Sequence, residues 1–470
     1  MRGLRSLLSI LVVFLGLAAY VYFVESKRTP ASEEEPKDKV FQVESDDIRE
    51  LRITADNGDT TTLTKAGVGS AWQVVEPLEA SADSTEVSGI VTNLASLEIQ
   101  RVVEEASSTL DEYGLSEPRI EVAFKTQEGD DFSRLLLGEK TATGSDLYAK
   151  LATEERVFLV SGFLESTFNQ SAFDLRDKAI LELDSQTIDR LEIVTQDASV
   201  ELTRSEGDWE MAHPWSARGD YGTIQGIVGR LTSAQMTSTV AGQADDLEPY
   251  GLTTPTATVT LGVGSSATTL AFGTTAESGG VYARDLSKPA VFTVDASLVD
   301  ELQKDPAEYR NKDLFGFRPF NATRFEITRE SETAIYEKVE APAPSGDEAE
   351  AAEGEAAEVW RQTAPVTREI DADNMQTALS GMANLRALYF AGPDVQTGLD
   401  RPITTVVAHY DAGKVDRVTF GLDEEDVYAA IEGEPGAARV DTQDYNLAIK
   451  SLMELGDEQA SDGLDPTDQD

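Results

Sequence analysis

Two histidines, His213 and His409, are the only side chains in the sequence whose ordinary pKa lies near neutrality. His213 precedes a proline in an expected loop, and His409 lies in an apolar run typical of a strand. A histidine that acts as a general base also needs a nucleophile and an orienting carboxylate, and the sequence marks neither. We interpret both histidines as structural or solvated side chains and predict no catalytic residue.

Two acidic runs have the oxygen ligands that calcium prefers: residues 56–59 (Asp-Asn-Gly-Asp) and residues 423–426 (Asp-Glu-Glu-Asp). Neither run belongs to a twelve-residue loop with the ligand spacing of an EF-hand. Asn-Gly between two apolar segments is instead a strong hairpin-turn signal. We interpret the first run as a turn and predict no metal site.

Other kinds of active site are also missing from the sequence. The chain has no cysteine, which excludes disulfides, thiolate metal ligands and cysteine nucleophiles. It contains no Walker-type phosphate loop, no Gly-x-Ser-x-Gly elbow and no His-Glu-x-x-His helix. We therefore expect no cofactor and a protein that is not an enzyme.

The charge balance is strongly acidic. The 470 residues include 86 Asp and Glu against 39 Lys and Arg, for a net charge of -47. Such a surface repels nucleic acid, so we expect no nucleic-acid partner. It suits cationic partners or life in high salt, and an acidic proteome in the source organism explains it without any binding role.

A repeat organises the chain. Each copy has one tryptophan, followed later by Gly-Leu-x-x-Pro, then Leu-Gly or Phe-Gly, then Tyr-Ala. The first two copies lie 137 residues apart at both the tryptophan and the Gly-Leu-x-x-Pro glycine. The markers are Trp72, Trp209 and Trp360, and Gly114, Gly251 and Gly398. Matched aromatic residues most often fill the equivalent core of each copy, so these markers indicate packing rather than a binding site.

The elements of one copy follow from hydrophobic spacing. Two strands come first, the second carrying the tryptophan. A helix follows that is capped by Ser84 and has one apolar face of Ile90, Val91, Leu94 and Leu97. After Gly-Leu-x-x-Pro we expect about four strands and a short closing helix, near residues 162–168, 296–303 and 445–455. The predicted fold class is α+β: three tandem repeats of one module with mainly antiparallel sheet plus helices, preceded by one transmembrane helix.

The predicted membrane segment is the uncharged run of residues 7–24. As a helix it would be about 27 Å long, close to the hydrocarbon thickness of a bilayer. Arg2 and Arg5 precede it, which favours a cytoplasmic N-terminus. The run is longer than the apolar region of a cleaved signal peptide, so we expect an uncleaved anchor with the bulk of the chain outside the cytoplasm.

The expected division of the chain follows from these elements. Residues 1–28 form the anchor, 29–39 a tether, 40–179 module 1, 180–313 module 2 and 314–455 module 3, with disordered acidic segments at 340–358 and 456–470. The triplets Arg176-Asp177-Lys178 and Arg310-Asn311-Lys312 end the first two modules. We interpret them as salt-bridged joints, with a ligand-binding pair of basic residues as the alternative.

The anchor, the tandem modules, Tyr-Gly-Leu-x-x-Pro, the Leu/Phe-Gly strand end and the Tyr-Ala strand together resemble the bacterial DUF 4340 family (domain of unknown function 4340). The resemblance covers most of residues 40–455 and implies a periplasmic protein held in the bacterial inner membrane. It also implies an accessory or scaffold role beside an ABC-type transport system, with permease or auxiliary subunits as partners. The alternative is an extracytoplasmic protein that binds a cationic or polymeric envelope substance.

Overall fold

The computed structural model describes residues 38–127, 131–340, 358–411 and 413–455. The chain divides into two compact units at Lys178/Ala179. The predicted anchor at 7–24, most of the acidic insert and the acidic tail lie outside the described residues. Within the described part, no helix is both long and apolar enough to cross a membrane.

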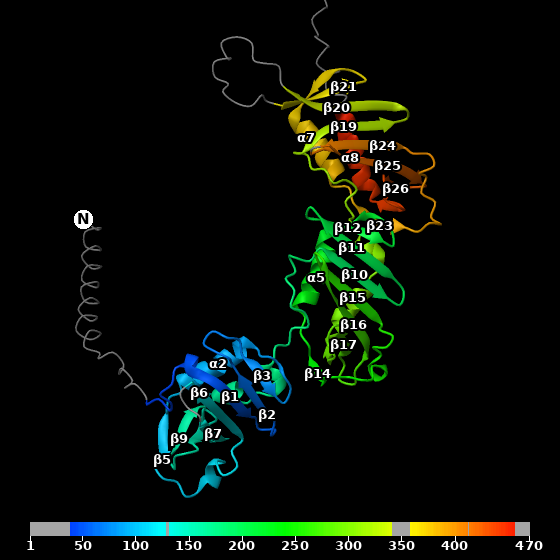
Figure 1. Cartoon of the computed structure of the whole chain (residues 1–470). Helices are drawn as coiled ribbons and strands as arrows, with labels where there is room; N and C mark the ends of the chain where they lie inside the picture. Colours follow the sequence, from blue (N-terminus) through cyan, green and yellow to red (C-terminus); the bar gives the residue numbers. More distant parts are fainter. Residues whose placement is uncertain (1–37, 128–130, 341–357, 412, 456–470) are drawn as a thin grey trace, which may run out of the picture. The chain divides into compact units, whose positions relative to one another are not determined.

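The first unit contains a single nine-stranded antiparallel sheet in the order β4-β3-β2-β1-β6-β7-β8-β9-β5 (Figure 1). Two meanders meet at its centre, where β1 pairs with β6. The elements are β1 (Ile48–Thr54), β2 (Thr60–Thr64), β3 (Gln73–Glu76), β4 (Ala80–Ser81), α2 (Ser84–Ala95), β5 (Arg101–Glu104), β6 (Ile120–Thr126), β7 (Ser133–Lys140), β8 (Asp146–Leu151), β9 (Val157–Ser161), α3 (Leu164–Phe168) and α4 (Ala172–Leu175).

The second unit repeats this arrangement twice. Its first sheet has the order β13-β12-β11-β10-β15-β16-β17-β18-β14. The elements are β10 (Arg190–Thr195), β11 (Ser199–Ser205), β12 (Asp208–His213), β13 (Ala217–Arg218), α5 (Tyr221–Ser233), β14 (Ser238–Ala241), β15 (Ala257–Val263), β16 (Ser266–Thr275), β17 (Val281–Asp285), β18 (Val291–Val294) and α6 (Ala296–Asp300).

The second sheet of this unit has the order β22-β21-β20-β19-β24-β25-β26-β27-β23. The elements are β19 (Ala322–Arg329), β20 (Glu332–Glu340), β21 (Glu358–Ala364), β22 (Arg368–Ile370), α7 (Ala372–Ala383), β23 (Ala387–Ala391), β24 (Thr404–Tyr410), β25 (Lys414–Asp423), β26 (Asp426–Ile431), β27 (Ala437–Val440) and α8 (Thr442–Glu454). One strand order in all three sheets confirms the predicted repetition.

Helix α2 shows how one face of each sheet is covered. Asp83, rather than the predicted Ser84, caps the helix, because its carboxylate accepts the backbone N–H groups of Thr85 and Glu86. Its buried side chains join one apolar cluster with strand residues such as Leu51 and Leu137. The core of the module therefore lies between the sheet and this helix.

The predicted fold class is wrong in its balance of elements. The described part of the protein is mostly antiparallel sheet, with nine strands in each of three sheets, and its few α-helices have between four and 13 residues. The hydrophobic patterns indicate about six strands per module. The rest were missed because β4 and β13 have two residues each and β5 has four, too few for a hydrophobic period to register.

Candidate functional site

The Gly-Leu-x-x-Pro signature lies where a loop is pressed against a strand. Gly114 has a φ of 64°, a left-handed conformation that favours glycine. A Cβ on Gly138, in β7, would lie 2.1 Å from the carbonyl oxygen of Tyr113. The same pairing recurs in the other modules, as Gly251 with Gly273 and as Gly398 with Gly421. Each pair of glycines therefore allows a backbone contact that no side chain would permit.

The repeated aromatic residues belong to the packing as well. All three marker tryptophans, Trp72, Trp209 and Trp360, are buried. The tyrosines form pairs with ring centroids 4.9 Å apart for Tyr113 and Tyr148, and 5.1 Å apart for Tyr250 and Tyr282. The repeat markers therefore have a packing role in each module. We look for a functional site among residues that differ between the modules.

The two histidines lie in different sheets. His213 ends β12 and is exposed, whereas His409 lies in β24 with its Nε2 3.6 Å from Glu326 Oε1. The acidic run at 56–59 is the turn between β1 and β2, in which Asn57 donates to Asp59 at 2.8 Å. Over the described residues, no group of three His, Asp or Glu side chains is arranged to hold a metal ion.

A buried charge cluster joins modules 2 and 3 within the second unit. Arg310, only 4% exposed at its side chain, donates to Glu434 Oε2 at 3.1 Å. Arg218 donates to the other oxygen of Glu434 at 2.7 Å and to the carbonyls of Asp313 and Leu314. The Arg310 guanidinium also lies 3.6 Å from the centroid of the Phe390 ring. Arg310, the first residue of the second triplet, therefore forms the salt bridge that we expected at the joint between modules 2 and 3.

The electrostatics of this cluster depend on its burial. Burial lowers the pKa of the Arg310 guanidinium, and the hydrogen bond to Glu434 opposes that shift. The Glu434 carboxylate thus compensates the charge of the poorly hydrated Arg310 guanidinium, and it also binds Arg218. The cluster holds two modules together and leaves little of Arg310 accessible to a ligand.

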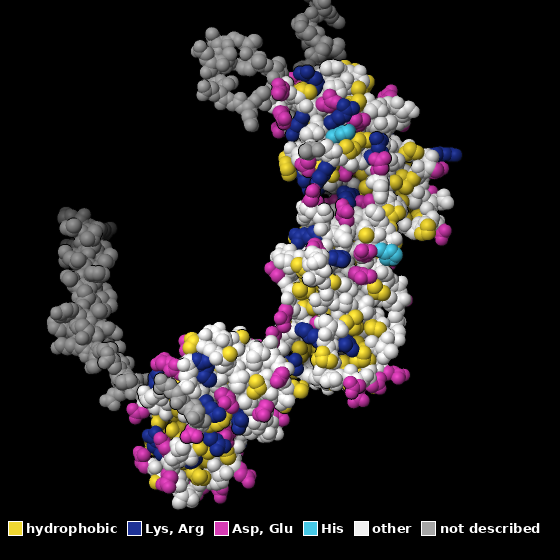
Figure 2. Space-filling model, in the orientation of Figure 1, with side chains coloured by type: hydrophobic (Ala, Val, Ile, Leu, Met, Phe, Trp, Pro, Cys, Tyr) yellow, Lys and Arg dark blue, Asp and Glu magenta, His cyan; other side chains and the backbone are white. Residues whose placement is uncertain are grey.

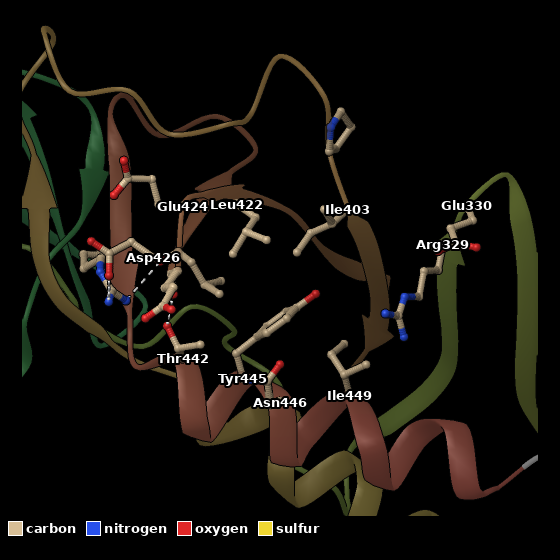
Figure 3. Close-up of a pocket in the computed structure, with 14 residues that line it drawn as sticks. Arg329, Glu330, Ile403, Leu422, Glu424, Asp426, Thr442, Tyr445, Asn446 and Ile449 are labelled. Atoms are coloured by element: carbon tan, nitrogen blue, oxygen red, sulfur yellow. Dashed lines mark hydrogen bonds and ion pairs between the residues drawn. The ribbon is translucent and has the colours of Figure 1, made fainter.

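A cavity of about 780 Å³ lies in module 3, between α8 and the strands above it (Figure 3). Ile403 and Leu422 face Tyr445 and Ile449 of the helix and give the cavity an apolar lining. Tyr445 is fixed by a hydrogen bond of 2.8 Å between its hydroxyl and that of Thr404. Tyr445 and Ile449 are each only 5% exposed, whereas Leu422 is 44% exposed, so little of the apolar lining that comes from the helix is accessible to solvent.

Charged side chains surround this apolar lining. Four carboxylates, Glu330, Glu424, Glu425 and Asp426, line the cavity together with two arginines. Asp426 is paired with Arg439, and Arg329 donates to the sulfur of Met453 at 2.9 Å. The acidic run at 423–426 contains three of these carboxylates, but the sequence does not show that it meets Glu330, Ile403 and helix α8, because these segments come together only in the folded sheet.

Module 1 has an ion-pair network at its own closing helix. Glu165 of α3 binds both Arg119, at 2.9 Å, and Lys140. Arg119 in turn lies 3.5 Å from Asp56 in the β1–β2 turn. Two cations thus connect the helix, the hairpin turn and the end of β7.

This network is expected to make module 1 sensitive to acid. The hydrogen bond from Lys140, supported by Arg119 and opposed by burial, holds the pKa of Glu165 below its ordinary value of 4.5. A carboxylate with a lowered folded-state pKa stabilises the fold above its unfolded pKa, and the contribution is lost as the pH falls through the folded pKa. Glu165→Gln should therefore lose less stability than the parent protein between about pH 5 and pH 3.

Denaturant unfolding of module 1 at several pH values measures this difference. Glu154→Gln is the matched control, because Glu154 forms a more exposed ion pair with Arg156 at 3.3 Å. The control should keep the acid dependence of the parent protein. Identical acid profiles for Glu165→Gln and the parent protein would contradict the prediction.

On the face shown in Figure 2, acidic and basic side chains lie intermixed.

Comparison with protein-family models finds two matches to the domain of unknown function DUF4340, at residues 72–218 and 209–402. The matches begin at two equivalent residues, Trp72, directly before β3, and Trp209, in β12. Each match therefore spans parts of two successive modules. A search of curated proteins finds no match to the chain.

Proposed function

Because the chain belongs to the DUF4340 family, we propose that it is a non-enzymatic, membrane-anchored scaffold whose modules act outside the cytoplasm as an accessory of an ABC-type transport system. The observation that carries the proposal is the threefold use of one sheet, in which the repeated signature residues serve packing. A protein built from such copies offers several similar surfaces along one chain, which suits a partner-binding arm.

Two further observations support this function. The uncharged run at 7–24, with Arg2 and Arg5 before it, is long enough to hold the chain at a bilayer and favours an extracytoplasmic location for the modules. The Arg310–Glu434–Arg218 cluster ties modules 2 and 3 into one compact unit. A scaffold needs such fixed joints, because partners bound to two modules must keep a defined spacing.

Isolation of the tagged full chain in mild detergent, followed by mass spectrometry, tests the proposal. We expect ABC-type permease or auxiliary subunits to be recovered with it, and the untagged chain is the control. A reporter that is active only outside the cytoplasm, fused after Asp470, should be active in membrane fractions. Recovery of a shortened chain from the soluble fraction, or of no transporter subunit, would contradict the proposal.

A further inference from the structure

In module 2, the edge strand β13 is covered by a segment from the end of the same module. The backbone N–H of Asn311 donates to the carbonyl oxygen of Arg218 at 2.8 Å, and that of Asp220 donates to the carbonyl oxygen of Tyr309 at 2.7 Å. Two such bonds are the pattern of an antiparallel pair, and Arg310 lies between the two bonded residues. The segment therefore extends the sheet of module 2 by one short strand.

The edge strand β4 of module 1 is covered in the same way. Asp177 donates to the carbonyl oxygen of Ser81 at 2.8 Å, and Asp83 donates to that of Leu175 at 2.9 Å. Arg176 lies between the bonded residues and pairs with the strand end, as Arg310 does in module 2. Two of the three modules therefore show what this sheet edge binds: an extended segment with a basic residue at its centre.

The same edge is open in module 3, where the edge strand is β22. The strand register places Glu369 at the position of Arg218, and Asp371 caps its helix as Asp220 does. Within the described residues, neither the carbonyl oxygen of Glu369 nor the N–H of Asp371 has a backbone partner on the side away from β21. Accordingly, Asp371 is exposed, whereas Asp220 is partly buried. β22 thus presents the hydrogen-bonding groups that its counterparts use, without the strand that satisfies them.

The side chain of Glu369 indicates the charge of the missing strand. In module 2, Arg218 and Arg310 donate to the two oxygens of Glu434, at 2.7 Å and 3.1 Å. Residues at these two positions can therefore bring their charged groups together. Because module 3 has a glutamate in place of Arg218, a basic residue at the position of Arg310 would pair with that carboxylate directly.

The last residues of the sequence are a poor match for this edge. Residues 456–470 contain six acidic residues and no basic one. Residues 369–373 contain three acidic residues and no basic one, so pairing the two segments would bring like charges together. Glycine, aspartate and proline make up more than half of residues 456–470, and all three are depleted in strands. The composition therefore favours a segment from another protein.

We propose that the open edge of β22 binds an extended segment of a partner protein by strand addition. A basic residue of that segment lies between the residue that accepts from Asp371 and the residue that donates to Glu369. The backbone hydrogen bonds fix the register, and the ion pair with Glu369 gives the preference for a basic residue. This inference rests on the proposed scaffold function, for which it gives the chemistry of one partner contact.

A peptide with the sequence of residues 309–312, Tyr-Arg-Asn-Lys, tests the proposal. It is blocked at its C-terminus, carries a fluorescent label at its N-terminus, and is titrated with the purified full chain in detergent while anisotropy is measured. The control peptide carries an N-methyl group on its asparagine, which removes the N–H that would donate to Glu369. The unmodified peptide should bind at least about fivefold more tightly, because the control loses one hydrogen bond. Equal binding, or no binding of either peptide, would overturn the proposal.

Variants of the protein assign the binding to β22. Glu369→Arg restores the residue type of module 2 and should weaken binding of the unmodified peptide at least about fivefold, because a like charge replaces the opposite one. Glu425→Arg is the matched control, since Glu425 is an exposed glutamate in the β25–β26 turn of the same module. It makes the same change in net charge and should bind as the parent protein does. Equal weakening by both variants would assign the binding to the acidic surface in general and overturn the proposal.

Removal of residues 456–470 separates a partner from the chain's own tail. A chain that ends at Leu455 should bind the peptide as the full chain does. Tenfold tighter binding to the shortened chain would show that the tail occupies the edge, and would overturn the partner assignment. Because these measurements use the purified chain, they are independent of whether transporter subunits are recovered with it.

Discussion

Replacing Glu434 by glutamine is expected to destabilise the second compact unit by about 3 kcal/mol, since removal of one partner leaves a buried charge without compensation. Arg310, with 4% of its side chain exposed, would keep its charge beside a neutral amide. Arg218 would lose the same ion pair, although it retains its hydrogen bonds to two backbone carbonyls. The loss is measurable as a lower urea midpoint for the unit, followed by tryptophan fluorescence.

Glu454→Gln is the control for this prediction. Glu454 lies in α8 of the same module and pairs with Lys450 at 3.5 Å, but both side chains are at least 60% exposed. Exposed pairs contribute little, so this variant should unfold with the parent protein. If both variants shifted the midpoint equally, the joint would not depend on its buried charge.

Replacing Gly138 by alanine should destabilise the first unit by about 3 kcal/mol, at the upper end of the cost of overpacking. The added Cβ would lie 2.1 Å from the carbonyl oxygen of Tyr113 and 3.0 Å from two backbone atoms of Gly114. These neighbours are backbone atoms, so no side-chain rotation relieves the clash, and the loop must move off β7. Denaturant unfolding of the full chain measures the effect, as a lower midpoint for the transition of the first unit.

Gly89→Ala tests whether the effect comes from this contact or from alanine itself. Gly89 lies inside α2 of the same unit, and a Cβ there meets nothing within 4 Å. Alanine favours a helix interior over glycine by about 0.8–1 kcal/mol, so this variant should be more stable than the parent protein. Two variants with the same substitution should therefore shift stability in opposite directions; shifts of the same sign would contradict the clash.

The repeat could be predicted from the sequence because its markers are local. Trp72 and Trp209 are buried at equivalent strands, and the spacing of the glycines follows from the close contact that each pair makes. The helices were also found near their actual bounds, because apolar residues three or four apart identify one face. The missed strands include the short edge strands β4 and β5 and also the interior strand β2, which was not separated from the tryptophan strand that follows it.

The candidate sites could not be predicted for a related reason. Arg310 and Glu434 are 124 residues apart in sequence, and nothing in the local pattern around Glu434 distinguishes it from the many other acidic residues. The lining of the module 3 cavity likewise comes from segments that are distant in the sequence, such as those of Glu330, Ile403 and Tyr445, and that meet only in the folded sheet. Charge pairing across a sheet is a property of the register, which single-sequence patterns do not specify.

The strand order also determines where the protein can be divided. The family matches begin at Trp72 and Trp209, yet each sheet is completed only by its two preceding strands, β1 with β2 or β10 with β11. A recombinant fragment cut at Trp72 would lack the partner of β6 and expose the unpaired backbone of a central strand, which is prone to aggregate. A soluble fragment of the first unit should instead run from Asp38, whose carbonyl accepts from Ile99, to Lys178.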